Sequence, residues 1–154
     1  MVVVRSEWEI GLLRAANQIV AEVLATLAEY IKPGVTTREL DAIAENMIRE
    51  RGAIPSFKGY NGYPAAICVS VEDEVVHGIP GKRVLKKGEI VSIDVGTCYC
   101  GYHGDAAVTL PCGEIDAQHR KLIEATDLAL SRAITVSKEG NVINEIGKIV
   151  EETC

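Results

Sequence analysis

The sequence predicts an α+β fold with a mainly antiparallel sheet, and its 154 residues are a normal length for a single domain over residues 1–154. Apolar residues recur every three or four positions before residue 52 and again after residue 116, which is typical of amphipathic helices. Between these parts, apolar and polar residues alternate in short runs that Gly and Pro interrupt. Helices on both sides of a block of strands favour the α+β class.

Two helices are predicted in the first third of the chain. The first begins at a capping box, with Ser6 as the N-cap and Glu9 three residues later, and an apolar stripe follows until Pro33. The second begins at Thr36 and ends near Gly52. Both therefore have a start signal and a stop signal in the sequence.

Three strands are predicted over residues 65–71, 89–95 and 104–110. Asp116 is the expected N-cap of a third helix that ends before residue 140. A short last helix is expected from residue 142 to about residue 152.

Composition limits the possible partners and location. The net charge of −6 is spread along the chain, whereas a nucleic-acid partner would call for a basic face. The apolar run at the N-terminus is too short for a signal peptide, so no secretory leader is expected, and no apolar run is expected to reach the length of a membrane span. Five cysteines, an odd number, fit reduced thiols. We therefore expect a soluble cytoplasmic protein with no nucleic-acid or membrane partner.

Two aspartates in apolar strands are the strongest site candidates. Asp94 in IVSIDV and Asp105 in GDAAV lie where an ionised carboxylate is costly without a partner. A hairpin turning about Tyr99-Cys100 would pair residues whose numbers sum to 199, so Asp94 would face Asp105 with Cβ atoms about 5 Å apart. A divalent metal would relieve their repulsion. In the alternative, one Asp caps a turn and the other lies at an exposed edge, and a slip of one residue would separate their faces.

The three histidines have different expected roles. His77 follows an apolar pair and precedes a Gly-containing turn, where it could donate a proton or orient a carbonyl near a metal. A lone histidine is nevertheless more often a structural hydrogen-bonding residue. His103 is expected on the strand face of Asp105, at the rim of the site, and His119 on a solvated helix.

The cysteines allow one further metal hypothesis. Cys98, Cys100 and His103 resemble a thiolate cluster, but two of them fall at the expected hairpin turn and no fourth ligand is in evidence. Cys68 and Cys112 are expected to be small core residues.

Four segments together resemble type I methionine aminopeptidases. They are FKGYNGYP at 57–64, VVHGIP at 75–80, IDVG at 93–96 and GYHGD at 101–105, in the order and spacing of that family. The resemblance covers the whole chain. It implies the N-terminal half of the pita-bread fold, with helices packed on one face of the sheet and a two-metal site between two pseudo-symmetric halves.

The same resemblance implies roles for individual residues. Asp94 and Asp105 match metal-binding aspartates, the first serving one ion and the second both. His77 matches a catalytic histidine that positions and protonates the scissile peptide. The substrate's methionine side chain would be bound by Phe57, Tyr60, Tyr63 and His77.

The implied activity is removal of the initiator methionine from peptides and nascent proteins whose next residue is small. A water or hydroxide held between two divalent ions (Co, Mn, Fe or Zn) would attack the first peptide carbonyl.

Two departures from the family pattern affect this expectation. The remaining ligands, one His and two Glu, are expected beyond Cys154, so activity should be impaired unless a partner or a second copy in a homodimer completes the site. Glu72 stands where the family usually has Asn, near a loop that often holds a monovalent cation. The alternative function is a catalytically inactive half-pita module for binding or assembly.

Overall fold

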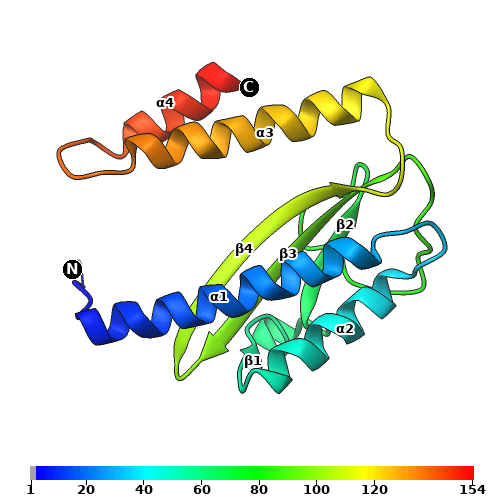
Figure 1. Ribbon diagram of the computed structural model, residues 1–154, viewed down its shortest axis with the longest axis horizontal. Helices are drawn as coiled ribbons and strands as arrows, with labels where there is room; N and C mark the ends of the chain where they lie inside the picture. Colours follow the sequence, from blue (N-terminus) through cyan, green and yellow to red (C-terminus); the bar gives the residue numbers. More distant parts are fainter. Residues whose placement is uncertain (1–2) are drawn as a thin grey trace. The chain divides into compact units, whose positions relative to one another are not determined.

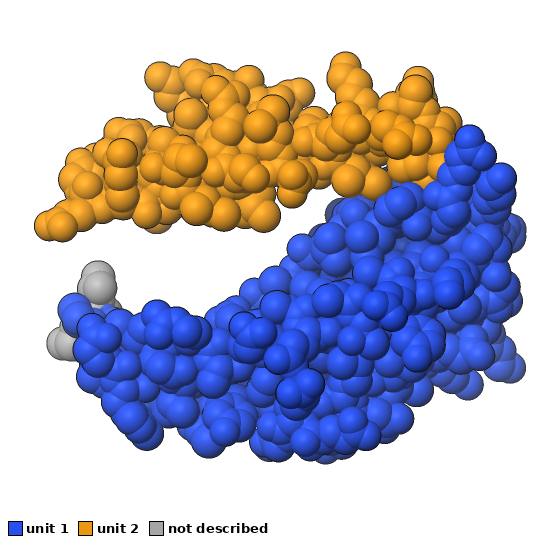
Figure 2. All heavy atoms as spheres, in the orientation of Figure 1, with its two compact units in different colours: residues 1–114 blue, residues 115–154 orange. Residues whose placement is uncertain are grey.

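The computed structural model describes residues 3–154, which form two compact units (Figures 1 and 2). Among the described residues, unit 1 comprises residues 3–114 and contains the sheet with two helices; unit 2, residues 115–154, contains two further helices. The single domain expected over residues 1–154 stays a prediction.

The two N-terminal helices begin at the predicted capping boxes. Helix α1 (Glu7–Tyr30) has Ser6 as its N-cap, and the Ser6 backbone N–H donates to Glu9 Oε2 at 2.7 Å. Helix α2 (Thr37–Glu50) has Thr36 as its N-cap and Glu39 at the reciprocal position. Because each box satisfies backbone N–H groups that have no partner within the helix, the starts of both helices follow from local sequence.

The sheet is antiparallel throughout, as predicted. Strand β3 (Ile90–Tyr99) is central and pairs along its full length with β4 (Tyr102–Pro111). Its other edge pairs first with β2 (Ile67–Val71) and then with β1 (Ile54–Pro55). Strand β1 was not predicted, because two residues are too few to show an alternation of apolar and polar side chains.

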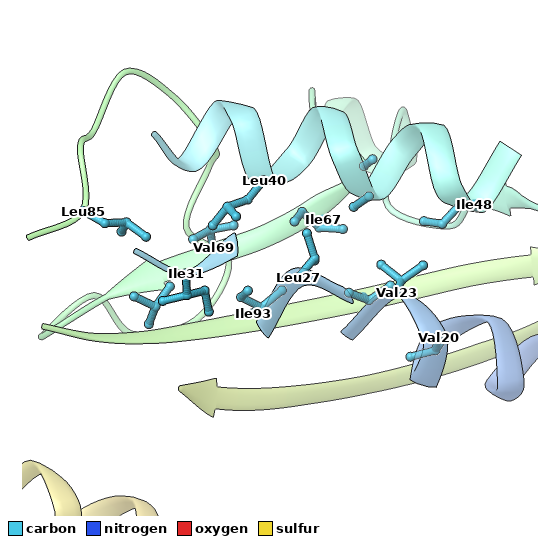
Figure 3. Close-up of a cluster of buried hydrophobic side chains, with 14 of the residues drawn as sticks. Val20, Val23, Leu27, Ile31, Leu40, Ile48, Ile67, Val69, Leu85 and Ile93 are labelled. Carbon is cyan, nitrogen blue, oxygen red and sulfur yellow. The ribbon is translucent and has the colours of Figure 1, made fainter. Parts of the chain in front are cut away.

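Helices α1 and α2 pack on one face of this sheet, and the core lies between them (Figure 3). Fully burying a Val, Leu or Ile side chain stabilises a fold by about 1.5–3 kcal/mol, so this cluster contributes much of the stability of unit 1. The largest fully buried side chains include Val20, Val23, Leu27, Leu40, Ile48, Ile67, Leu85 and Ile93.

Alternation along β3 decides which residues face away from the helices. Ile93 and Val95 are buried in the core, and Thr97 Oγ1 donates to the Ala16 carbonyl of α1 at 3.0 Å. Since successive side chains of a strand point to opposite faces, Asp94 and Gly96 face the side without α1 and α2.

Helix α1 is long and apolar enough to cross a membrane by length and composition alone. The expectation that no segment reaches that length is therefore wrong. The apolar stripe of α1 is nevertheless buried against the sheet at Ala16, Val20, Val23 and Leu27, and core helices of soluble proteins can have the same length and composition.

Unit 2 contains helices α3 (Ala117–Val136) and α4 (Asn144–Thr153), both close to their predicted ranges. Asp116 is the N-cap of α3, as predicted, and accepts a hydrogen bond from the His119 backbone N–H at 2.8 Å. The His119 ring is half-buried, with Nδ1 3.3 Å from an Asp116 carboxylate oxygen, so it is less solvated than expected.

Candidate active site

The β3–β4 hairpin turns at Cys100-Gly101, one residue later than predicted. Asp94 faces Ala107 and Asp105 faces Gly96, so the prediction that the two aspartates face each other is wrong. Cys100 has φ 51° and Gly101 has φ 83°, the left-handed pair that a two-residue type I′ turn requires. The turn therefore lies where the backbone is left-handed at two successive residues, and the sequence signals this only at the glycine.

The error in register is two residues, which leaves the facing of each side chain unchanged. Asp94 and Asp105 still point to the same face, as diagonal neighbours in the ladder. Such neighbours usually have Cα atoms roughly 7–8 Å apart, close enough for their charges to interact.

The Asp94 carboxylate is half-buried and incompletely satisfied. Its Oδ1 is buried and has no hydrogen-bond partner among the described residues. Burial raises the pKa of Asp94, the charge of Asp105 raises it further, and His77 acts in the opposite direction. An ionised Asp94 would therefore gain from a bound cation.

Carboxylate oxygens are suitable donors for a divalent metal, and the unpartnered Oδ1 of Asp94 fits such a role. Within residues 3–154, however, no group of three or more His, Cys, Asp or Glu side chains could hold a metal ion. Asp94 and Asp105 thus fit part of a metal site and need further donors to complete one.

A pocket of about 570 Å³ opens beside Asp94 in unit 1. All four residues predicted to bind substrate line it, three from the segment 57–64 and His77 from the loop after β2. Asp105 is not among the lining residues. The lining consists of Phe57, Tyr60, Asn61, Gly62, Tyr63, Pro64, Cys68, His77, Ile79 and Asp94.

Cys68 is a pocket residue that sequence reasoning missed. It is buried, as expected of a core residue, but it lies directly opposite Asp94 on β2 and therefore shares its face. Burial raises the pKa of the Cys68 thiol, and the charges of Asp94 and Asp105 add to this. Cys68 thus presents a neutral thiol to the pocket. A signal was present in the sequence, since the strand alternation places Cys68 opposite the core face of Ile67 and Val69.

Phe57 lies directly against Gly96 of β3. A Cβ atom added to Gly96 would lie 2.5 Å from Phe57 Cε1, so only glycine leaves room for the ring. Because Gly96 is the partner of Asp105, the ring covers the strand face that carries both carboxylates. This close approach fixes one wall of the pocket.

His77 belongs to a loop that is held against β2. The Gly78 carbonyl accepts a hydrogen bond from the Val69 backbone N–H at 2.9 Å, and the Gly78 N–H donates to Ser70 Oγ at 3.1 Å. His77 itself is exposed and has φ 55°, an unusual conformation for a residue other than glycine. The loop brings its imidazole to the pocket that Asp94 also lines.

The other candidate residues have structural partners. His103 shares the strand face of Asp105, as predicted, and its Nδ1 lies 2.8 Å from Ser56 Oγ. Cys98 pairs with His103, and Cys100 is exposed in the turn, but no three-ligand thiolate cluster exists within the described chain. Glu72 Oε1 accepts a hydrogen bond from the Ile90 backbone N–H at 2.7 Å, so this carboxylate supports the start of β3.

Comparisons with known proteins identify the family. The chain matches metallopeptidase family M24 over residues 11–154. It is 48% identical to methionine aminopeptidase 1 of Bacillus subtilis over 151 residues, which cover 98% of this chain and 61% of that protein. It is 44% identical to the methionine aminopeptidase of Clostridium acetobutylicum, with 99% and 61% covered. The chain thus spans about three fifths of the length of these relatives.

Solved structures give the same result. The methionine aminopeptidase of Thermotoga maritima superposes with a TM-score of 0.97 at 38% identity, covering 99% of this chain and 62% of that one. The prolidase of Pyrococcus furiosus, at 24% identity, shares the fold with a TM-score of 0.88 over 98% of this chain and 43% of its own. The chain therefore belongs to metallopeptidase family M24 and has the α+β pita-bread architecture of its methionine aminopeptidase relatives.

Proposed function

We propose that this chain contributes one side of the active site of a methionine aminopeptidase, which removes the initiator methionine from peptides and nascent proteins in the cytoplasm. The observation that carries the proposal is the convergence of three kinds of group on one pocket. These are the partly buried Asp94 carboxylate, the His77 imidazole and the rings of Phe57, Tyr60 and Tyr63. A carboxylate that can hold a metal ion, a proton donor and an apolar pocket are what metal-assisted hydrolysis beside a methionine side chain requires.

Asp94 and Asp105 would hold the divalent metal on which a metallopeptidase depends. The candidates are Co, Mn, Fe and Zn, with two ions in a complete site. When bound, such ions polarise the scissile carbonyl and supply an activated water. The unpartnered Oδ1 of Asp94 and its repulsion with Asp105 support this assignment, because both are relieved by a cation.

The remaining pocket residues would bind and orient the substrate. The rings of Phe57, Tyr60 and Tyr63 offer an apolar surface to the methionine side chain, and sulfur–aromatic contacts add roughly 0.3–1.5 kcal/mol each. The small Cys68 side chain also lines the pocket, on the strand opposite Asp94. His77 would donate a hydrogen bond to the scissile peptide and supply a proton to the leaving amine.

Two carboxylates are too few to hold two ions, so one copy of residues 3–154 needs further ligands. We expect them to be one His and two Glu from additional sequence or a partner, or the Asp94, Asp105 and His77 of a second copy in a twofold dimer. The alternative is an inactive module that binds peptides without turnover.

Metal titration and peptide hydrolysis test the proposal together. We expect Mn(II) to bind the purified chain, and the assembled enzyme to release methionine from Met-Ala-Ser but not leucine from Leu-Ala-Ser. Mass in solution shows whether the active species is a dimer. If the assembled protein has all its metal ligands and bound metal, and binds Met-Ala-Ser but releases no methionine, the alternative of an inactive binding module is supported instead.

A further inference from the structure

We propose that Tyr63 is a positioning residue, whose hydroxyl clamps the loop carrying His77 while its ring lines the pocket. The inference rests on the proposed function for its catalytic consequence, but the clamp itself is a property of the described chain. It assigns to the hydroxyl a role separate from the apolar contact of the ring.

The Tyr63 hydroxyl lies between two backbone carbonyls, one at the start of β2 and one in the loop that carries His77. It donates to the Gly78 carbonyl at 3.0 Å and to the Ile67 carbonyl at 3.1 Å. A phenol has one proton, so the two carbonyls share it in a three-centre hydrogen bond. Burial raises the pKa of Tyr63, and the adjacent Cys68 thiol raises it further, so the hydroxyl keeps its proton. The pocket segment 57–64 is thereby tied to the residue that follows His77.

Gly78 is held against β2 at three further points. Its N–H donates to the buried Ser70 Oγ at 3.1 Å, and its carbonyl also accepts from the Val69 N–H at 2.9 Å. A Cβ atom on Gly78 would lie 2.2 Å from the Val69 carbonyl oxygen, so the backbones are in direct contact. This contact fixes the position of Gly78, the residue next to His77. The Tyr63 hydroxyl donates its hydrogen bond to the Gly78 carbonyl from the pocket side.

The two residues before Gly78 need such a support. Val76 has φ 35° and His77 has φ 55°, conformations that are costly for side chains with a Cβ and especially for a β-branched valine. Both side chains are exposed, so packing of the side chains does not hold them. Strained backbone of this kind persists only where the surroundings determine it, and here the hydrogen bonds to Gly78 do so.

The clamp can be removed without removing the pocket wall. Tyr63→Phe keeps the ring and loses only the hydroxyl, and Tyr63 is outside the core cluster that holds α1 and α2 on the sheet. Tyr30→Phe, at the end of α1, is a matched control that deletes a hydroxyl outside the pocket. Ser70→Ala removes the hydrogen bond from the Gly78 N–H to Ser70 Oγ. It shows whether loss of a hydrogen bond to Gly78 changes the conformation of the His77 loop.

The first readout is the imidazole resonances of the full chain labelled at histidine, recorded without metal. The sequence contains only His77, His103 and His119, so each signal can be assigned. We expect Tyr63→Phe and Ser70→Ala to shift or broaden the His77 signals, with those of His103 and His119 unchanged and the Tyr30→Phe spectrum identical to wild type. If Ser70→Ala moves the His77 signals and Tyr63→Phe leaves them in place, the clamp is disproved.

The second readout separates orientation from binding in the metal-loaded, assembled enzyme. Since the ring still contacts the methionine side chain, Tyr63→Phe should lower kcat at least about tenfold and change KM by less than about threefold. A raised KM with unchanged kcat would show that Tyr63 only binds substrate and would overturn the inference. If the wild type releases no methionine, the proposed function fails, and the His77 resonances still decide whether the clamp exists.

Discussion

Asp94 and Asp105 are diagonal neighbours on one face of the β3–β4 hairpin, because Asp105 pairs with Gly96 and not with Asp94. Their carboxylates are therefore near enough to repel and far enough apart to leave room for a cation. We therefore expect the loss of either carboxylate to impair metal binding by the other.

We expect Asp94→Asn and Asp105→Asn each to abolish stabilisation by Mn(II). A ligand at one hundred times its Kd stabilises the folded state by about 2.7 kcal/mol, and neither variant should retain this gain. Without metal, neither variant should unfold more readily than wild type, since each loses a like-charge repulsion. Thermal melts with and without Mn(II) measure both effects. Asp127→Asn, exposed on α3, is the control, and equal Mn(II) stabilisation of all three variants would contradict the site.

Glu9 makes stability depend on pH at the start of α1. Hydrogen bonds from the Ser6 backbone N–H and hydroxyl, and then from the Tyr102 hydroxyl, lower the pKa of Glu9 from 4.5 to about 2. A lowered folded-state pKa stabilises the fold fully above the unfolded-state value, and that contribution disappears as pH falls from about 4.5 through about 2.

Glu9→Gln should therefore flatten the loss of unfolding free energy over this acidic range. Glutamine keeps the capping geometry without the charge. Urea denaturation between pH 2 and 5 measures the slope, with Glu29→Gln in the exposed last turn of α1 as the control. A Glu9→Gln variant with the wild-type slope would show that this carboxylate does not set the acid sensitivity.

Gly96→Ala should disturb Phe57. The added methyl would approach Phe57 Cε1 to 2.5 Å, so the ring or the strand must shift, at a cost of typically 1–3 kcal/mol. The same substitution should cost much less in a Phe57→Ala background, where the clash is absent. Urea denaturation of the four members of this double-mutant cycle measures the coupling, and additive effects would mean that the ring does not depend on Gly96.

Gly104→Ala should weaken the packing of α1 on β4. Its Cβ would lie 2.6 Å from the backbone of both Ala16 and Asn17, and backbone atoms have little freedom to move away. Gly11→Ala on α1 has nothing within 4 Å and should instead stabilise the helix by about 1 kcal/mol. Opposite signs of the change in unfolding free energy are the expected result. A Gly104→Ala variant as stable as wild type would show that α1 can adjust.

Most elements of the fold could be predicted because their signals are local. The Ser6 and Thr36 capping boxes and the Asp116 N-cap mark three helix starts correctly, since a cap is decided by residues within one turn. Likewise, the alternation along β3 predicts that Asp94 lies on the opposite face from the buried Ile93. The two residues of β1 carry no such pattern.

The register of β3 against β4 could not be predicted without knowing the geometry of the turn between them. Alternation with a period of two fixes the face of each strand residue, but a shift of two residues leaves that face the same. The pairing is set by the left-handed backbone at Cys100 and Gly101, and a cysteine is no sequence signal for that conformation. Asp94 and Asp105 could therefore be placed on one face by sequence, but not at their true separation.

The sequence by itself determined the α-helices, the three longer strands, the family and the residue types of the site: two aspartates, one histidine and three aromatic rings. Only the tertiary structure decided how they meet. The pocket depends on the backbone contact of Gly78 with Val69, on the contact of Gly96 with the Phe57 ring, and on the Tyr63 hydroxyl that joins two loops. Each of these contacts joins residues from different strands or loops. Periodicity describes only neighbours along the chain, so it holds no information about such distances.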